Sequence, residues 1–310
     1  MNILLWHVHG SWTTALVQGP HTYLLPVVSD RGPEGLGRAR TWDWPDAALE
    51  LTPNQLADAD VDVVLLQRPH ELELVERWLG RRPGRDLPAI YVEHNAPQGR
   101  IEEMRHPAAD RDDITLVHVT HFNDLFWDAG STRTAVIEHG IVDPGYRYTG
   151  ELPEAAVAIN EPSRRWRVTG TDLLPRLNGV VPLRLFGIGA GEMGGIENLP
   201  QADLHTEMAR RRAYLHPIRW TSLGLSLLEA MQLGMPVVVL ATTEAVEAVP
   251  PEAGILSTRV DVLSRGLREL IDDPDLALER GQAARRVALE RYGLQRFLDD
   301  WDRLLEVVTA

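Results

Sequence analysis

The chain has 310 residues, a length that allows two ordinary domains, each with its own hydrophobic core. Hydrophobic residues make up 44% and charged residues 25%, as in soluble globular proteins, and no apolar run is longer than a strand. We therefore expect no membrane segment, no signal peptide and a cytoplasmic location. The formal net charge of -14 argues against sequence-independent binding to nucleic acid or to anionic membranes.

Cysteine and lysine are both absent, which restricts the available chemistry. Without cysteine there are no disulfides, no thiolate catalysis and no Cys-ligated zinc. All 31 basic residues are arginine, so Schiff-base and Lys-base chemistry are also excluded. A bound anion would have to be held by arginine, backbone amides or helix N-termini.

Short apolar runs alternate with amphipathic segments along the first half, the pattern of a parallel βα sheet. The segment 71–79 has one apolar face and is expected to be a helix. The region 30–53 is rich in Gly, Pro and Arg and is expected to be a long connection without regular structure. Strands are predicted at 3–8, 22–28, 61–67, 89–93, 115–119 and 135–138.

The span 143–153 is polar, contains Gly and Pro, and is expected to link two domains. After it the βα pattern restarts. Strands are predicted at 155–159, 183–187, 214–216, 237–240 and 254–256, and helices at 170–177, 204–212, 223–233, 244–249, 260–271, 276–288 and 294–308. This pattern predicts two facing, doubly wound, Rossmann-like domains with a ligand at the C-terminal ends of their strands.

Polar segments that contain histidine follow five of the six strands predicted in the first half. A single histidine of this kind is more often a hydrogen-bonded core or loop residue than a ligand. Their repetition at strand ends favours a binding site. The candidates on this side are His9, Gly10, Trp12, Arg68, His94 and His121.

In the second half, Arg164 and Arg165 follow a predicted strand and could clamp phosphate oxygens, although a solvated turn is the alternative. A glycine-rich loop begins at Gly187, but such loops are common. Thr221 and Ser222 are expected to cap the following helix, whose N-terminus offers backbone amides to a phosphate. The amides in question are those around Leu223, Gly224 and Leu225.

Glu229 is a carboxylate on the almost wholly apolar helix predicted at 223–233. An unpaired buried charge is costly, so this carboxylate needs a partner, which we interpret as a bound ligand. Metal binding is poorly supported. His7 and His9 lack a third ligand, and the acidic run 58–62 precedes a strand instead of following it.

The segment 219–241 resembles the GT-B-fold glycosyltransferases, specifically the retaining family 4 (group 1). Members of that family carry a Glu, then Gly-Phe-Gly, a second Glu followed by Ala-Met, a Gly-x-Pro and a valine-rich strand. Glu229-Ala230-Met231, Gly234 and Pro236 match these features. Weaker correspondences are His94 and the segments 119–123, 137–141, 170–174 and 292–301.

The resemblance implies that residues 1–148 form an acceptor domain and residues 149–310 a nucleotide-sugar domain, whose last helix packs back on the first. It implies that Glu229 binds the ribose hydroxyls, that the amides of residues 223–225 approach the diphosphate, and that Arg164 neutralises the leaving group. By the same resemblance, His94 lies near the donor sugar and the acceptor. Two positions depart from the family pattern: Thr169 stands where the family has Lys, and Thr221 where it has the first Glu.

The leading hypothesis is therefore a retaining, metal-independent glycosyltransferase that uses a nucleotide-diphosphate sugar as substrate and needs no further cofactor. The departures at Thr169 and Thr221 favour an alternative, a noncatalytic nucleotide-sugar sensor or partner subunit on the same scaffold. A nucleotide-sugar epimerase is a third possibility, without an additional carboxylate set to support it. The nucleotide, the sugar, the acceptor and the oligomeric state are not specified by the sequence.

Overall fold

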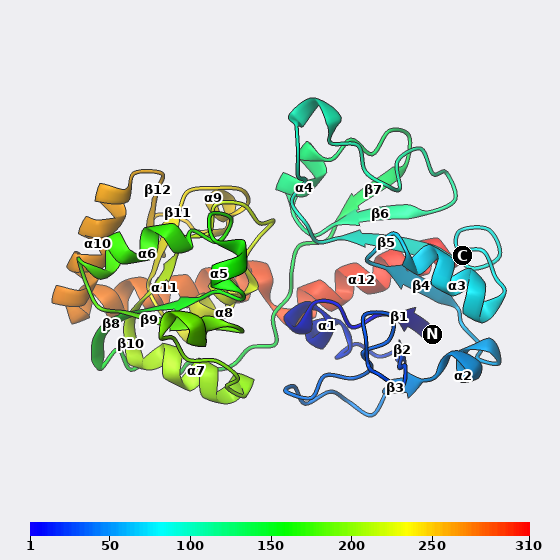
Figure 1. Cartoon of the computed structure of the whole chain (residues 1–310), viewed down its shortest axis with the longest axis horizontal. Helices are drawn as coiled ribbons and strands as arrows, with labels where there is room; N and C mark the ends of the chain where they lie inside the picture. Colours follow the sequence, from blue (N-terminus) through cyan, green and yellow to red (C-terminus); the bar gives the residue numbers. More distant parts are fainter. The chain divides into compact units, whose positions relative to one another are not determined.

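The computed structural model describes all 310 residues and divides into two compact units (Figure 1). Unit 1 comprises Met1–Val142 and Leu294–Ala310, and unit 2 comprises Asp143–Gly293. The last helix of the chain thus belongs to the same unit as its N-terminus. None of the helices is long and apolar enough to cross a bilayer.

Unit 1 contains a seven-stranded parallel sheet with the strand order β3-β2-β1-β4-β5-β6-β7. Its central strands are buried apolar runs, because helices cover both faces of the sheet. The strands are β1 (Asn2–Leu5), β2 (Thr22–Pro26), β3 (Ala48–Leu51), β4 (Val63–Leu66), β5 (Ala89–Glu93), β6 (Thr115–His118) and β7 (Arg133–Val136).

The helices of unit 1 are α1 (Gly10–Leu16), α2 (Pro53–Ala57), α3 (Glu71–Leu79), α4 (His121–Phe126) and α12 (Leu294–Thr309), with a 3-10 turn at Ile101–Glu103. The C-terminal helix α12 packs on α1, and the ring centroids of Trp12 and Trp301 lie 5.7 Å apart. Gly140 allows close approach of the same helix, since a Cβ there would lie 2.2 Å from the Cβ of Phe297.

Several elements of unit 1 differ from the sequence expectation, among them α2 and α4, because no helix is predicted at 53–57 or 121–126. The region 30–53 is not devoid of regular structure, because it contains β3. The loop before β3 is also held in place: the guanidinium of Arg38 donates to the carbonyls of Trp44, Pro45 and Ala48. Helix α1 lies in a segment where no helix is predicted.

Unit 2 contains a five-stranded parallel sheet with the order β12-β11-β10-β8-β9. Its strands are β8 (Leu152–Ala158), β9 (Leu183–Phe186), β10 (Arg211–His216), β11 (Val237–Leu240) and β12 (Gly254–Ser257). Its helices are α5 (Pro162–Arg165), α6 (Leu174–Asn178), α7 (Gln201–Arg210), α8 (Leu225–Leu233), α9 (Ala245–Ala248), α10 (Val260–Asp272) and α11 (Pro274–Tyr292), with 3-10 turns at Thr171–Leu173 and Ala190–Met193.

The predicted strands and helices of unit 2 occur in the predicted order, with the short helix α5 as an additional element, and the strand over residues 237–240 has the predicted bounds. Helices α6 and α10 supply Leu177, Leu263 and Leu267 to a core on one face of the sheet. Helix α8 packs against α7 and α11. The first strand, β8, begins inside the segment 143–153 that is predicted to be a linker.

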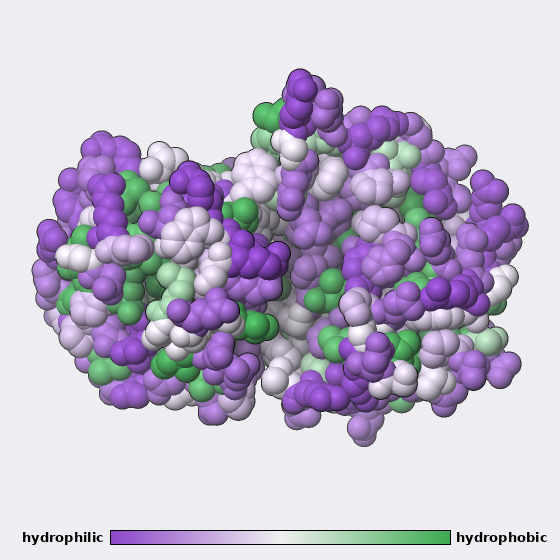
Figure 2. Space-filling model, in the orientation of Figure 1, coloured by the Kyte–Doolittle hydropathy of each residue, from purple (hydrophilic) through white to green (hydrophobic).

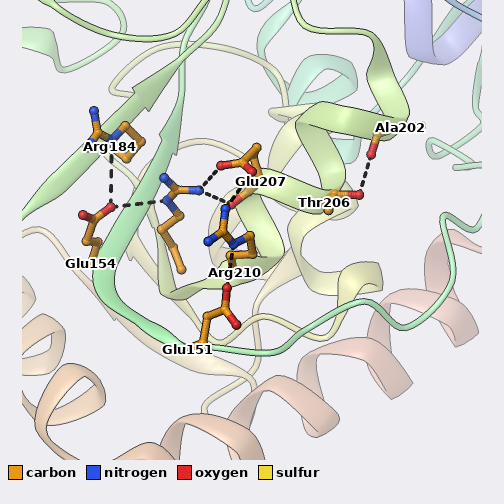
Figure 3. A network of polar contacts seen from close by, with 8 residues as sticks. Glu151, Glu154, Arg184, Ala202, Thr206, Glu207 and Arg210 are labelled. Atoms are coloured by element: carbon orange, nitrogen blue, oxygen red, sulfur yellow. Dashed lines mark hydrogen bonds and ion pairs between the residues drawn. The ribbon is translucent and has the colours of Figure 1, made fainter.

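The N-terminal ends of β8 and β10 carry a network of ion pairs (Figure 3). Arg211, the first residue of β10, is bound by Glu154 and Glu207, while Arg210 is bound by Glu151 and Glu207. Each of these charges has a counter-ion within the network. Hydrophilic residues cover much of the face shown in Figure 2.

Candidate functional site

The C-terminal ends of the unit 2 strands meet at one edge of the sheet, where doubly wound folds bind ligands. The loops after β8 and β9 are joined there. The amide of Glu161 donates to the carbonyl of Ile188 at 2.7 Å, and the amide of Ile188 donates to Asn160 Oδ1 at 3.0 Å. Gly187 has a φ of 131°, and a Cβ there would lie 2.2 Å from the carbonyl oxygen of Ile159, so only glycine fits.

Arg164 and Arg165 lie at this edge, at the end of the short helix α5, but in different electrostatic settings. The side chain of Arg164 is 70% exposed and forms an ion pair with Glu161. The side chain of Arg165 is half-buried and has no ion pair or hydrogen bond in the structure. Burial lowers the pKa of Arg165, and the neighbouring charge of Arg164 lowers it further. Glu161 opposes these two effects electrostatically, but it forms no ion pair or hydrogen bond with Arg165, which is therefore a partly desolvated cation without a paired carboxylate.

The N-terminus of α8 lies in the loop that follows β10. The helix begins at Leu225, and its N-cap is Gly224, without any side-chain cap. The predicted capping by Thr221 and Ser222 is thus wrong. Leu223 and Gly224 separate Ser222 from the first helical residue. Of the first-turn amides, that of Leu227 donates to the carbonyl of Gly224 at 3.0 Å, and the helix has no side-chain cap.

Glu229 is 4% exposed, as expected for a residue on this apolar helix. It does not depend on a ligand for a partner, which corrects the interpretation from the sequence. One carboxylate oxygen lies 3.1 Å from Gln201 Nε2 and 3.3 Å from His205 Nε2. Both partners come from α7, which packs against α8. The buried charge is thus held by two polar side chains from the neighbouring helix.

Thr169, the residue at the position of the family's Lys, is fully buried. Its hydroxyl group hydrogen-bonds to that of Thr171 at 2.8 Å and donates to the carbonyl of Trp166. It therefore takes no part in an exposed anion site. Thr221 is half-buried, while Ser222 and Leu223 are buried.

His216, the last residue of β10, occupies the same edge and is not among the residues selected from the sequence. It is 2% exposed, and its Nδ1 has no hydrogen-bond partner. The signal that could have identified it is the one used for the first half of the chain: a histidine at the C-terminal end of a buried strand.

Unit 1 also gathers polar residues at the C-terminal edge of its sheet. Three histidines follow β1, β5 and β7, namely His9, His94 and His139. The ring centroids of His9 and His94 lie 4.2 Å apart, and the ring of Trp12 meets His94 edge-on at 4.8 Å. The sequence-predicted residues His9, Trp12 and His94 are thus brought together, and His139 joins them through electrostatic interaction with His9.

Burial keeps these three histidines neutral. It lowers the pKa of His9 to about 4 and that of His139 to about 3, and it places the pKa of His94 well below 6.5. The neighbouring imidazoles add a smaller effect in the same direction for His94. Nε2 of His94 is fully buried without a hydrogen-bond partner. A neutral imidazole with an unused nitrogen can donate a hydrogen bond to a substrate hydroxyl or accept one from it.

Arg68 lies at the same edge, after β4, and is held by a carboxylate that the sequence had not indicated. Arg68 Nε donates to Glu71 Oε1 at 2.7 Å, and the amides of Gln67 and Arg68 donate to Glu71 Oε2. Gly10 begins α1 and lies beside Trp42. His121 is the exposed first residue of α4, and no contact joins it to His9, His94 or His139.

In neither unit do three or more His, Asp or Glu side chains come together in a group that could hold a metal ion. The charged and polar groups at the two sheet edges include arginine, backbone amides, neutral imidazoles and the carboxylates of Glu71, Glu161 and Glu229. Such a set can bind an anion in unit 2 and hydroxyl groups in unit 1.

Part of unit 2 is similar to a known protein family. Residues 195–287, all in unit 2, match the family model described as glycosyl transferases group 1. No curated protein matches the sequence.

Solved structures resemble the chain over nearly its whole length. Sucrose-phosphate synthase from Thermosynechococcus elongatus has a TM-score of 0.74 at 12% identity, over 99% of this chain and 98% of that one. Anabaena HepE in complex with UDP has a TM-score of 0.69 at 12% identity, over 99% and 100% of the two chains. A glycosyltransferase from Rickettsia africae has a TM-score of 0.68 at 13% identity, over 99% and 98%.

Sequence identities this low establish only a shared fold. The family match additionally relates residues 195–287 of unit 2 to the group 1 glycosyl transferases. The predicted pair of Rossmann-like sheets is confirmed. The chain combines the GT-B fold over nearly its whole length with a group 1 segment in its second unit, and it is a glycosyltransferase.

Proposed function

We propose that the protein is a retaining, metal-independent glycosyltransferase that transfers a sugar from a nucleotide-diphosphate donor to an acceptor hydroxyl. The observation that carries the proposal is the half-buried, unpaired Arg165 at the sheet edge of unit 2 that also holds the uncapped N-terminus of α8. Both features favour a bound anion, and together they suit a diphosphate. In this proposal, unit 2 holds the donor and unit 1 the acceptor.

Arginine and helix amides would stabilise the negative charge that develops on the leaving diphosphate, which is the main electrostatic task of the reaction. Of the two arginines, Arg165 is better suited than Arg164, because Glu161 already neutralises Arg164. Glu229 would accept hydrogen bonds from the ribose hydroxyls while His205 and Gln201 fix its carboxylate. Retention of the anomeric configuration is proposed from the resemblance to family 4.

The donor that we propose to test first is a uridine diphosphate sugar. The Anabaena HepE structures, which match 99% of this chain, are described as complexes with UDP and with UDP-glucose. In unit 1 the neutral His94 would hydrogen-bond a reacting hydroxyl, with His9, Trp12 and Arg68 lining the acceptor side.

The test is to incubate the protein with a panel of nucleotide sugars and to measure release of the nucleoside diphosphate. Slow donor hydrolysis with one sugar, with the released sugar in the donor's anomeric configuration by NMR and no loss of rate in EDTA, is the expected result. Stabilisation by a nucleotide sugar without any release would instead indicate the noncatalytic sensor. Inverted configuration would reject retention, and loss of activity in EDTA would reject metal independence.

The two arginines provide a matched pair of variants. Arg165→Ala should weaken binding of the nucleoside diphosphate by about 10- to 100-fold, because a charged hydrogen bond contributes about 1.5–3 kcal/mol. Arg164→Ala should change it by less than about threefold, since surface ion pairs contribute little. If Arg164→Ala weakened binding more than Arg165→Ala, then Arg164 and not Arg165 would bind the diphosphate.

A further inference from the structure

His216 is a buried polar side chain that the protein itself leaves unsatisfied. It ends β10 at the C-terminal edge of the unit 2 sheet, and only 2% of it is exposed. Nδ1 has no hydrogen-bond partner, and no protein group is hydrogen-bonded to Nε2. Buried polar atoms are normally paired, because an unpaired one costs folding stability. An exception of this kind at a binding edge points to a partner that is not part of the chain.

The imidazole lies directly against the N-terminus of α8. A Cβ at Gly224, the N-cap of that helix, would lie 2.3 Å from His216 Cε1 and 2.8 Å from Nε2. Gly224 has a φ of −73°, which any residue can adopt, so its backbone does not require glycine. The missing side chain instead leaves room for the imidazole, and Nε2 is the ring nitrogen nearer to the helix N-cap.

The protonation state follows from the surroundings. Burial lowers the pKa of His216 to about 4, and no charged group contributes to this shift. The ring is therefore neutral near pH 7, with one nitrogen protonated. Of the two ring nitrogens, only Nδ1 is fully buried without a partner. A buried donor without a partner is rarer than a buried acceptor without one, so we assign the proton to Nε2 and leave Nδ1 as the bare acceptor.

We propose that His216 is a donor-site residue whose Nε2–H donates a hydrogen bond to a phosphate oxygen bound at the N-terminus of α8. The inference rests on the proposed function, because it assigns a residue to the same diphosphate. A phosphate oxygen fits better than a hydroxyl group for two reasons. The amides of a helix N-terminus attract anions, and the half-buried Arg165 at the same sheet edge adds positive charge.

The decisive variant is His216→Phe, which keeps a ring of similar size and removes both nitrogens. Binding of inorganic pyrophosphate and of UDP would be measured by calorimetry, and the melting temperature would be measured without ligand. We expect the Phe variant to bind pyrophosphate and UDP about tenfold more weakly, the value of one hydrogen bond. Its melting temperature should stay the same or rise, because an unsatisfied polar atom has been removed from the interior.

Two further variants complete the experiment. His118→Phe is the matched control, because His118 is a fully buried histidine of unit 1 with neither nitrogen hydrogen-bonded, and its Nε2 lies 3.8 Å from Asp124 Oδ1. It should leave pyrophosphate and UDP binding unchanged. His216→Gln keeps an N–H donor and should recover part of the lost affinity.

The outcomes separate this inference from the function on which it rests. Unchanged affinity in His216→Phe, while the wild type binds UDP, would overturn the role of His216 and leave the proposed function intact. A wild type that binds neither pyrophosphate nor any nucleoside diphosphate would overturn both. Weaker binding together with a lower melting temperature in the Phe variant, without recovery in the Gln variant, would make His216 a structural residue and overturn the inference.

Discussion

The substitution Glu229→Gln tests the ribose assignment most directly, because it replaces a carboxylate with an amide of the same shape. Gln201 and His205 hold the carboxylate at 3.1 and 3.3 Å, so the side chain has little freedom to move. Hydrogen bonds to a charged group contribute about 1.5–3 kcal/mol and neutral ones about 0.5–1.5 kcal/mol, a difference of about 1–1.5 kcal/mol for each bond. For two ribose hydroxyls the loss is about 2–3 kcal/mol, or roughly 30- to 150-fold in affinity.

The assay is calorimetric titration of the wild type and of Glu229→Gln with UDP and with 2′,3′-dideoxyuridine diphosphate. The wild type should lose affinity when the two hydroxyl groups are removed, whereas the variant should discriminate little between the two nucleotides. Glu207→Gln serves as the control, since Glu207 belongs to the ion-pair network at the opposite ends of the strands (Figure 3). It should bind both nucleotides like the wild type.

The same titrations can also refute the ribose assignment. Removal of the charge disturbs the contact between α7 and α8 as well as any ribose contact. If Glu229→Gln weakens UDP and the dideoxy nucleotide by the same factor, then Glu229 joins two helices and does not bind the ribose.

Three further predictions follow from the burial of particular side chains. Burial lowers the pKa of His9 and His216 from 6.5 to about 4, so between these pH values the unfolded chain binds more protons than the folded one. The free energy of unfolding should therefore fall as the pH falls through this range, by on the order of 2 kcal/mol per histidine near pH 5. A constant melting temperature from about pH 7.5 to 5 would contradict this. Trp301→Ala should destabilise the protein by about 3–5 kcal/mol in denaturant titrations, because Trp301 is 1% exposed, whereas Val307→Ala on the same helix, where Val307 is 63% exposed, should change stability by less than about 0.5 kcal/mol. His94→Gln should lower the rate of sugar transfer by on the order of 100-fold while UDP affinity stays the same, and an unchanged rate would remove His94 from the reaction.

The regular elements whose apolar pattern is strong could be predicted from the sequence. The strand 237–240 and the helix 71–79 have the predicted bounds, because an unbroken valine run and a one-sided apolar pattern each allow one structure. Helix α1 could not be predicted in this way. It begins with Gly10 and contains Trp12, Thr13 and Thr14, which are modest helix formers, and it is stabilised by contact with α12 from the other end of the chain.

The edge strand β3 was missed for a related reason. It has four residues, and only Ala48 is buried, so its pattern is too weak to stand out from the Gly- and Pro-rich region around it. Its pairing with β2 and the contacts of Arg38 define it instead. Both are tertiary interactions.

At the candidate site, the sequence determined which residues follow strands and therefore which residues share an edge of a sheet, because parallel strands place their C-terminal ends together. It could not determine which of them already have partners. Only the tertiary structure pairs Arg164 with Glu161, leaves Arg165 half-buried without a counter-ion and holds Glu229 with two side chains of another helix. The partners of Glu229 lie 28 and 24 residues away along the chain and burial depends on the whole fold, whereas Arg164 and Glu161 are neighbours whose pairing depends on the local turn of α5. Pairing and burial together decide which charge remains available to bind a ligand.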